Sequence, residues 1–158
     1  MLCAGCGSDR TDKPSASSTA ATASSTTAAG QLIDFDKNND GGVVLRKAAD
    51  VSKLEGTPDG FKQFMAGVID TMVNSAQLGD DCRPTVSVAK FDSSGYALGS
   101  FWNCEGAVLM WAEQDGAWQQ AWGGQSIPEC ADMKKYSIPV SIAGSKCSDG
   151  TKAVAYAG

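Results

Sequence analysis

Residues 106–122 read GAVLMWAEQDGAWQQAW, and this stretch decides the fold. The Asp-Gly pair at 115–116 is a strong signal for a two-residue β-hairpin turn, because both central residues of that turn need a positive φ. On either side of the pair, residues 106–112 and 118–122 are rich in apolar and aromatic side chains. The sequence therefore predicts an antiparallel β-hairpin over this stretch.

The position of the turn predicts which residues of the hairpin lie opposite one another. With the Asp-Gly pair in the turn, Trp111 pairs with Gln120, and Leu109 pairs with Trp122. Side chains alternate between the two faces of a strand, so the hairpin has an aromatic face and a face of aliphatic and small residues. The aromatic face is expected to carry Leu109, Trp111, Trp118 and Trp122, and the other face Val108, Met110, Ala112, Ala117 and Ala121.

Two interpretations of the aromatic face follow, because only one face of the hairpin can pack against a helix. If the aliphatic face meets the helix, Trp111, Trp118 and Trp122 line an open surface beside Gln120, suited to binding sugar rings, peptides or an apolar ligand. If the aromatic face meets the helix, the tryptophans form the core, which is the commoner outcome in a small domain. The sequence leaves both interpretations open.

The rest of the chain predicts one main helix and several further strands. Apolar residues recur at helical spacing over residues 58–75, with Thr57 as the expected N-cap. Further elements are expected at residues 44–54 (a shorter helix), 85–91, 96–104 and 152–157 (strands), and 128–136 (one or two helical turns). This order predicts an α+β domain in which one main helix packs on a meandering antiparallel sheet, similar in outline to the cystatin-like or NTF2-like folds.

Four of the six cysteines lie in the second half of the chain, and they are Cys82, Cys104, Cys130 and Cys147. Four cysteines in a small domain predict two disulfides and an oxidising compartment. They allow three pairings, of which we favour Cys82–Cys104 and Cys130–Cys147, because each closes a local unit. A zinc site is the alternative, but no CxxC pair occurs after residue 6.

The N-terminal part of the chain has the composition of a linker. Residues 14–30 read PSASSTAATASSTTAAG, and such a run buries too little apolar surface to offset the entropy of ordering it. Residues 7–32 are therefore expected to be a disordered Ser/Thr/Ala-rich linker. Residues 33–158 are expected to form a single globular α+β domain.

Residues 1–6 read MLCAGC, and Ala4, Gly5 and Cys6 match the lipobox of bacterial lipoproteins, in which small residues precede a lipidated cysteine. A Ser/Thr-rich tether after the cysteine is also typical of that family. Cys3 stands where leucine is usual, and five residues before Cys6 are too few for a complete signal peptide. The resemblance implies that residues 1–6 are a lipobox and signal remnant and that Cys6 carries a lipid that anchors the chain to a membrane.

The C-terminal half is similar to small secreted actinobacterial proteins, in which a DG-x-W hairpin precedes a Pro-x-Cys, an Ile-Pro segment and a final cysteine. The matching residues are Asp115, Gly116, Trp118, Pro128, Cys130, Ile138, Pro139 and Cys147. This resemblance implies a secreted domain and carries no activity.

A run of acidic and amide residues after the linker resembles the calcium loop of an EF-hand or dockerin. Counted from Asp36, side-chain oxygens stand at positions 1, 3 and 5, which are Asp36, Asn38 and Asp40, and Gly41 stands at position 6. Position 12 should hold a bidentate acid, but it holds Lys47. The run is either a calcium site without its strongest ligand or an Asx-rich turn.

Composition excludes several function classes. The chain contains no histidine, so His-based triads and His-containing metal sites are excluded. The formal charge is −5 and there is no basic stripe, which argues against binding to nucleic acid. No pair of carboxylates is singled out by its spacing, and a thiol nucleophile would have no histidine base, so the sequence does not predict an enzyme.

The sequence therefore predicts a non-enzymatic binding or interaction module outside the cytoplasm. It is either held at the cell membrane by Cys6 or secreted, and its partner is an extracytoplasmic protein, peptide or glycan. Two alternatives stay open: a calcium-dependent structural or assembly module, and an inhibitor of a secreted hydrolase. Apart from the calcium ion, no cofactor is expected.

Overall fold

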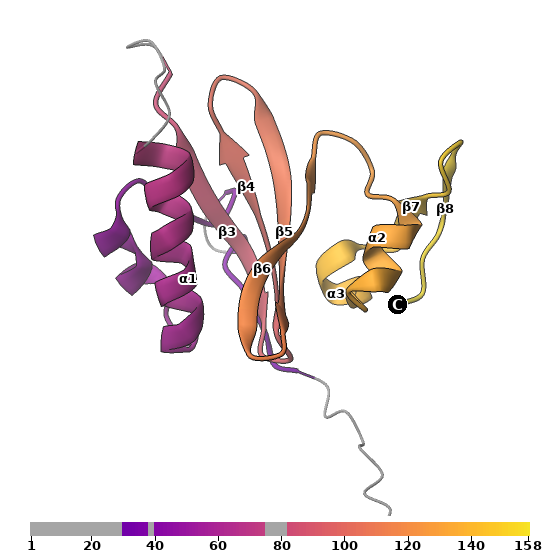
Figure 1. Ribbon diagram of the computed structural model, residues 1–158, viewed down its shortest axis with the longest axis horizontal. Helices are drawn as coiled ribbons and strands as arrows, with labels where there is room; N and C mark the ends of the chain where they lie inside the picture. Colours follow the sequence, from indigo (N-terminus) through magenta and orange to yellow (C-terminus); the bar gives the residue numbers. More distant parts are fainter. Residues whose placement is uncertain (1–29, 38–39, 75–81) are drawn as a thin grey trace, which may run out of the picture.

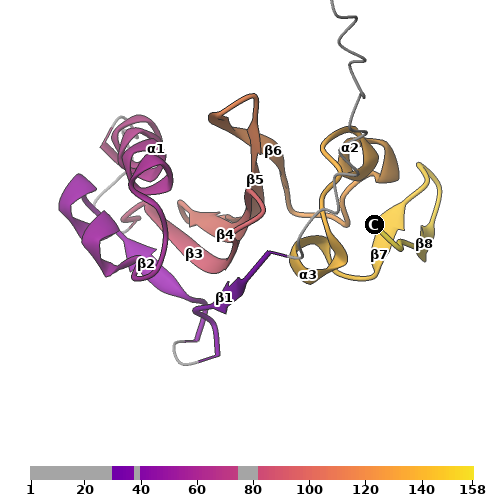
Figure 2. The ribbon, with the colours of Figure 1, turned by 90° about the horizontal axis from the view of Figure 1, so that it is seen from below.

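The computed structural model describes residues 30–37, 40–74 and 82–158, and these residues form three layers (Figures 1 and 2). The middle layer is a sheet of β1 (Leu32–Asp34), β2 (Val43–Leu45), β3 (Thr85–Asp92), β4 (Tyr96–Trp102), β5 (Gly106–Gln114) and β6 (Ala117–Gly124). One face is covered by the 3-10 helix η1 (Ala48–Lys53), the helix α1 (Asp59–Ile69) and the π-helical turn η2 (Asp70–Asn74). The other face is covered by a C-terminal unit of α2 (Cys130–Lys135), α3 (Val140–Ala143), β7 (Lys146–Ser148) and β8 (Ala153–Ala155).

The sheet is an antiparallel meander, as the sequence predicted. β3, β4, β5 and β6 follow one another in space, and β1 and β2 both pair with the outer edge of β3. The chain is therefore α+β with one main helix and an antiparallel sheet. Two boundaries are corrected. Residues 44–54 form the end of β2 and then η1 rather than one helix, and Leu32, which was assigned to the linker, already pairs with Asp92.

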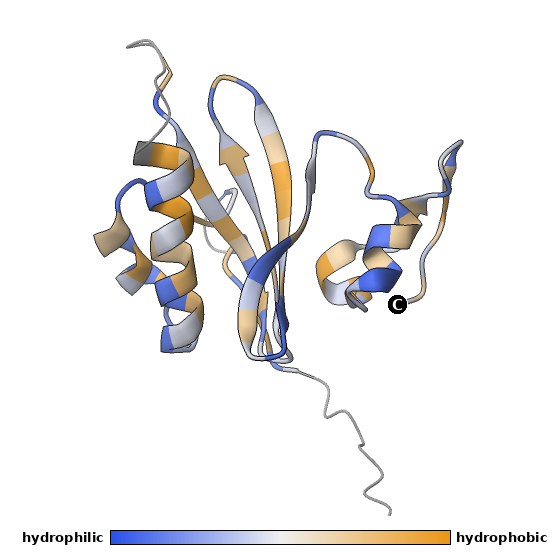
Figure 3. Ribbon diagram, viewed as in Figure 1, coloured by the Kyte–Doolittle hydropathy of each residue, from blue (hydrophilic) through white to orange (hydrophobic). Residues whose placement is uncertain are grey.

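The predicted helix over residues 58–75 is confirmed in extent, since α1 runs from Asp59 to Ile69 and continues as the π-helical turn η2 to Asn74. Pro58 is its N-cap, and Thr57 does not cap it, because the Thr57 hydroxyl donates to the Leu54 carbonyl over 2.9 Å instead. Phe61, Met65 and Ile69 follow at intervals of four residues, so they share one face of the helix. All three are fully buried against the sheet. Figure 3 shows hydrophobic residues in α1 and in the middle of β5.

The Asp-Gly turn lies where the sequence predicted it, with φ of 53° at Asp115 and 78° at Gly116. The predicted pairing of Trp111 with Gln120 is confirmed. The predicted pairing of Leu109 with Trp122 is wrong, because β6 has one extra residue, a β-bulge, between Gln120 and Trp122. Trp122 therefore pairs with Met110 and lies on the face of the sheet opposite to Trp111.

The C-terminal unit forms a second core on the face of the sheet away from α1. Met110 packs there with Met133, Ile138 and Ile142, and Trp122 packs against this cluster. The buried Tyr156 hydroxyl donates to the Ile138 carbonyl over 2.7 Å. The sequence predicted α2 and β8 within the ranges 128–136 and 152–157. It did not predict that they pack together with α3 and β7 as a third layer on the sheet.

Two disulfides are present, one beside the sheet and one within the C-terminal unit, and both predicted pairings are confirmed. Cys82 pairs with Cys104, with a Cα–Cα distance of 5.5 Å, next to the paired ends of β3 and β4. Cys130 pairs with Cys147, with a Cα–Cα distance of 4.9 Å, and ties α2 to β7.

Some predicted features lie outside the described residues. These are the lipidation site Cys6, most of the linker at residues 7–32, and Asn38 of the calcium loop. Among the helices that the structure describes, none is long and apolar enough to cross a membrane.

Candidate functional site

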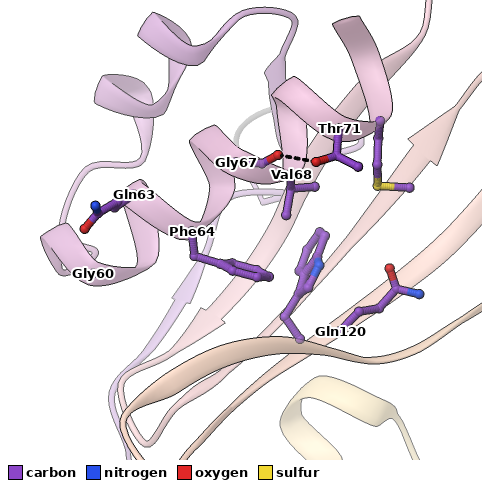
Figure 4. A pocket seen from close by; sticks show the side chains of 9 residues that line it. Gly60, Gln63, Phe64, Gly67, Val68, Thr71 and Gln120 are labelled. Atoms are coloured by element: carbon purple, nitrogen blue, oxygen red, sulfur yellow. Dashed lines mark hydrogen bonds between the residues drawn. The ribbon is translucent and has the colours of Figure 1, made fainter. Parts of the chain in front are cut away.

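A groove of about 610 Å³ runs along α1 (Figure 4). It lies between that helix and the two strands at one edge of the sheet, β5 and β6. We call it the α1–β6 groove. It is lined by Gly60, Gln63, Phe64, Gly67, Val68, Thr71 and Met72 from α1 and η2, and by Trp111 and Gln120 from β5 and β6. Figure 4 shows Phe64 and Val68 on the helix side of the groove and Gln120 on the strand side.

The helix lines the groove with a stripe beside its buried face. Gly60, Phe64, Gly67 and Thr71 are three or four residues apart, so they follow one another along one side of the helix. The Thr71 hydroxyl donates to the Gly67 carbonyl over 3.0 Å. The groove wall is therefore continuous over nearly the full length of α1.

Two glycines keep this wall open. A Cβ atom added to Gly60 or to Gly67 would meet no heavy atom within 4 Å, and neither residue has a positive φ. Neither packing nor backbone geometry therefore requires glycine at these positions. At Gly67, in the interior of α1, glycine costs the helix about 1 kcal/mol relative to alanine. The effect of both glycines is to leave empty space along the groove.

The lining of the groove is apolar and uncharged. Phe64, Val68, Met72 and Trp111 supply hydrophobic surface, while Gln63, Thr71 and Gln120 supply neutral polar groups. Among the described residues that line it, none carries a charge. Such a surface favours a ligand without formal charge, because burying an unpaired ion costs several kcal/mol.

Trp111 lies at the base of the groove and is 0% exposed. Its ring packs over Gly99 of the neighbouring strand, where an added Cβ would lie 2.8 Å from the ring atom Cζ3. The indole Nε1 is buried and finds no hydrogen-bond partner among the residues that the structure describes. A buried donor left without a partner costs about 1–3 kcal/mol.

The structure separates the residues of the predicted ligand face. Trp111 and Gln120 both line the groove. Trp118 packs against the start of α1, with its ring centroid 4.6 Å from that of Phe61, and Trp122 lies on the opposite face of the sheet. The predicted open surface of three tryptophans is therefore corrected, because the aromatic face meets the helix and the bulge in β6 turns Trp122 away.

The helix side of the groove was missed in the sequence. Its signal was present as Gly60 and Gly67, seven residues apart in an otherwise regular helical pattern. The structural role of a glycine inside a helix can be inferred only when it is known whether that side of the helix faces the core, the solvent or a groove.

Other cavities among the described residues have a different character. A cavity of about 670 Å³ is lined partly by the charged residues Asp40, Arg46, Lys53 and Glu55. Another, of about 570 Å³, is lined by Glu105, Val108 and Gln125 among others. Neither combines an apolar lining with a buried, unpartnered donor.

The calcium prediction stays a prediction. The Asp36 carboxylate accepts a hydrogen bond from the Gly41 N–H over 2.7 Å, and Asp34 accepts one from the Lys37 N–H over 3.2 Å. These bonds span five and three residues, whereas an Asx-turn spans two, so they do not decide between the two interpretations of the loop. Asp36 and Asp40 are exposed, and Asn38 between them lies outside the described residues.

The groups with shifted pKa values lie away from the groove. The ion pair with Lys53 and the N–H groups of Arg46 and Lys47 lower the pKa of Asp50 to about 2. Burial raises the pKa of Tyr96 and of Tyr156. Asp50 orders the start of η1 and Tyr156 belongs to the second core, so the causes of these shifts are structural.

Comparison with known proteins gives no match. No family model matches the chain, and neither a curated protein nor a solved structure matches it. The cystatin-like or NTF2-like outline therefore has no structural neighbour to support it.

Proposed function

We propose that this chain is a non-enzymatic binding module that acts outside the cytoplasm, and that the α1–β6 groove holds its ligand. The observation that carries the proposal is the pair of glycines, Gly60 and Gly67, which leave the groove open although nothing in the packing requires them. Helix stability is lost at Gly67, and the open space beside both glycines belongs to a groove of about 610 Å³.

The shape and lining of the groove favour an apolar ligand without charge. Ligand pockets are typically concave, mostly hydrophobic, and carry a few polar groups that fix orientation. Here Phe64 and Val68 supply the hydrophobic wall, and Gln120 supplies an amide at the opposite side. The cystatin-like or NTF2-like outline belongs to the same proposal, with one helix laid across a meander and the groove between them.

Gly67→Leu tests the site, because it fills the groove with a side chain that the helix tolerates. The neutral dye Nile red serves as the probe, and its fluorescence is titrated against both proteins. We expect the substitution to weaken Nile red binding at least about tenfold. The free energy of unfolding should not fall, since leucine is a better helix former than glycine by about 0.5–1 kcal/mol.

Lys62→Leu is the matched control, because it adds the same side chain to α1 outside the residues that line the groove. It should bind Nile red as the unsubstituted chain does. Equal binding by the chain and by Gly67→Leu, or no binding by either, would show that the groove is not the site.

The proposed location is outside the cytoplasm, at a membrane to which a lipid on Cys6 anchors the chain. It is supported by the lipobox-like residues 4–6, by the Ser/Thr-rich run that follows, and by the two disulfides, which favour an oxidising compartment. When the chain is made from its own gene in its natural host, it should incorporate labelled palmitate. Cys6→Ala should abolish the label and Cys3→Ala should retain it. A chain that takes no label would make the module a freely secreted one, and a labelled Cys6→Ala variant would place the lipid on another residue.

A further inference from the structure

Among the described residues that line the groove, Trp111 has a buried side-chain polar atom without a hydrogen-bond partner, the indole N–H. Tryptophan usually finds a hydrogen-bond partner for this group when it is buried. Here Nε1 is fully covered and has none among the described residues. The cost of such an orphan donor, about 1–3 kcal/mol, would disappear if a phenylalanine stood at this position.

The fold holds this donor in a fixed place. Trp111 sits in the middle of β5, directly opposite Gln120 in β6. Its ring occupies the space that Gly99 leaves, and a side chain at position 99 would also collide with the Ser87 carbonyl. The indole therefore cannot turn away without a loss of packing, and its N–H is held in a ring that lines the groove.

We propose that the ligand of the α1–β6 groove presents a hydrogen-bond acceptor to Trp111 Nε1, which makes it a neutral, mainly apolar molecule with a carbonyl, ester or ether oxygen. The inference rests on the proposed function, since it needs the groove to be the binding site. The indole N–H is a donor only, so it selects for an acceptor. The described residues that line the groove include no cation, which favours a neutral oxygen over a carboxylate.

Access to the donor requires a small movement of the lining. Nε1 is covered, so an entering oxygen has to displace a neighbouring side chain. Gln120 lies opposite Trp111, lines the groove and is exposed, so it is a lining side chain that can move without loss of core packing. Once displaced, the Gln120 amide is placed to hydrogen-bond a second polar group near the surface.

Acetophenone and ethylbenzene test this inference, because they have the same phenyl ring and two further carbons and differ in one carbonyl oxygen. Each is titrated into the ¹⁵N-labelled full chain, and the indole N–H resonance of Trp111 is assigned by its absence from Trp111→Phe. Acetophenone should move this resonance downfield, beyond the ring-current shift that ethylbenzene also causes. In the Trp111→Phe variant, the ratio of acetophenone to ethylbenzene affinity should fall about five- to tenfold.

The outcomes separate the inference from the proposed function. If both probes perturb the groove residues and shift the Trp111 indole equally, the groove binds ligands but the acceptor inference is wrong. If neither probe perturbs any groove residue, the proposed function itself fails. If Trp111→Phe does not fold, single replacements of Trp102, Trp118 and Trp122 assign the Trp111 resonance by elimination, and the comparison of the two probes on the unsubstituted chain still decides the matter.

Discussion

Replacing Phe61 with alanine is expected to lower the free energy of unfolding by about 3–5 kcal/mol, the largest loss for any single core truncation proposed for this chain. Phe61 is 0% exposed and lies where the helix meets the sheet. Its ring centroid is 4.6 Å from that of Trp118 and 5.0 Å from that of Phe91. Alanine would remove three aromatic contacts at once and leave a cavity between two layers that cannot close without bending the sheet.

Phe64→Ala is the matched control for this prediction, because it truncates the same side chain three residues further along α1. Phe64 is only half-buried and lines the groove, so the expected loss is about 1–2 kcal/mol. Urea denaturation followed by far-ultraviolet circular dichroism measures both variants. Equal losses would mean that the groove side of α1 is packed as tightly as the core side, which would argue against an open site.

The hairpin shows how far the sequence could predict this fold. The Asp-Gly pair specifies the turn on its own, since glycine and aspartate accept the positive φ values that the turn needs. From the turn, pairing could be followed correctly as far as Trp111 and Gln120. The next pair was wrong, because a single extra residue in β6 reverses which face every later side chain occupies. Strict alternation contains no signal for such a bulge.

The C-terminal layer and the groove were harder to predict, for different reasons. The elements of the layer are too short to give a periodic pattern, and α3 has only four residues. The layer is defined by long-range contacts, such as the one between Ser141 and the buried Asp92 carboxylate, 3.3 Å apart. In the groove, a glycine such as Gly67 within a helical pattern indicates from sequence only a locally weaker helix. Its role depends on Trp111 across the gap, which the helix sequence alone does not specify.

Removing the Cys130–Cys147 disulfide is expected to release the C-terminal unit from the sheet. The unit consists of helices of six and four residues and a hairpin with strands of three residues. Elements of this length are not stable alone. The disulfide closes a loop with a sequence separation of 17, and its loss should cost about 3 kcal/mol through the entropy of the open chain.

Hydrogen exchange on the double variant Cys130→Ala, Cys147→Ala measures the effect at individual amides. The N–H of Tyr156 donates to the Ser145 carbonyl and that of Ile138 donates to the Met133 carbonyl, so both report on the C-terminal unit. We expect these two amides to exchange at least about a hundredfold faster, because the local free energy of opening falls by the same 3 kcal/mol or so. Amides of Met65 and Val88, in the core on the α1 side, should change far less.

Cys82→Ala, Cys104→Ala is the matched control, because its disulfide closes a loop of similar sequence separation, 22, in a different part of the fold. That disulfide joins strands that are already paired from Thr85 and Trp102 onward. Its loss should therefore leave the exchange of Tyr156 and Ile138 close to that of the unsubstituted chain. If instead both double variants accelerate all four amides alike, the two cores unfold as one cooperative unit. In that case the C-terminal layer is held by its packing on Met110 and Trp122 rather than by its own disulfide.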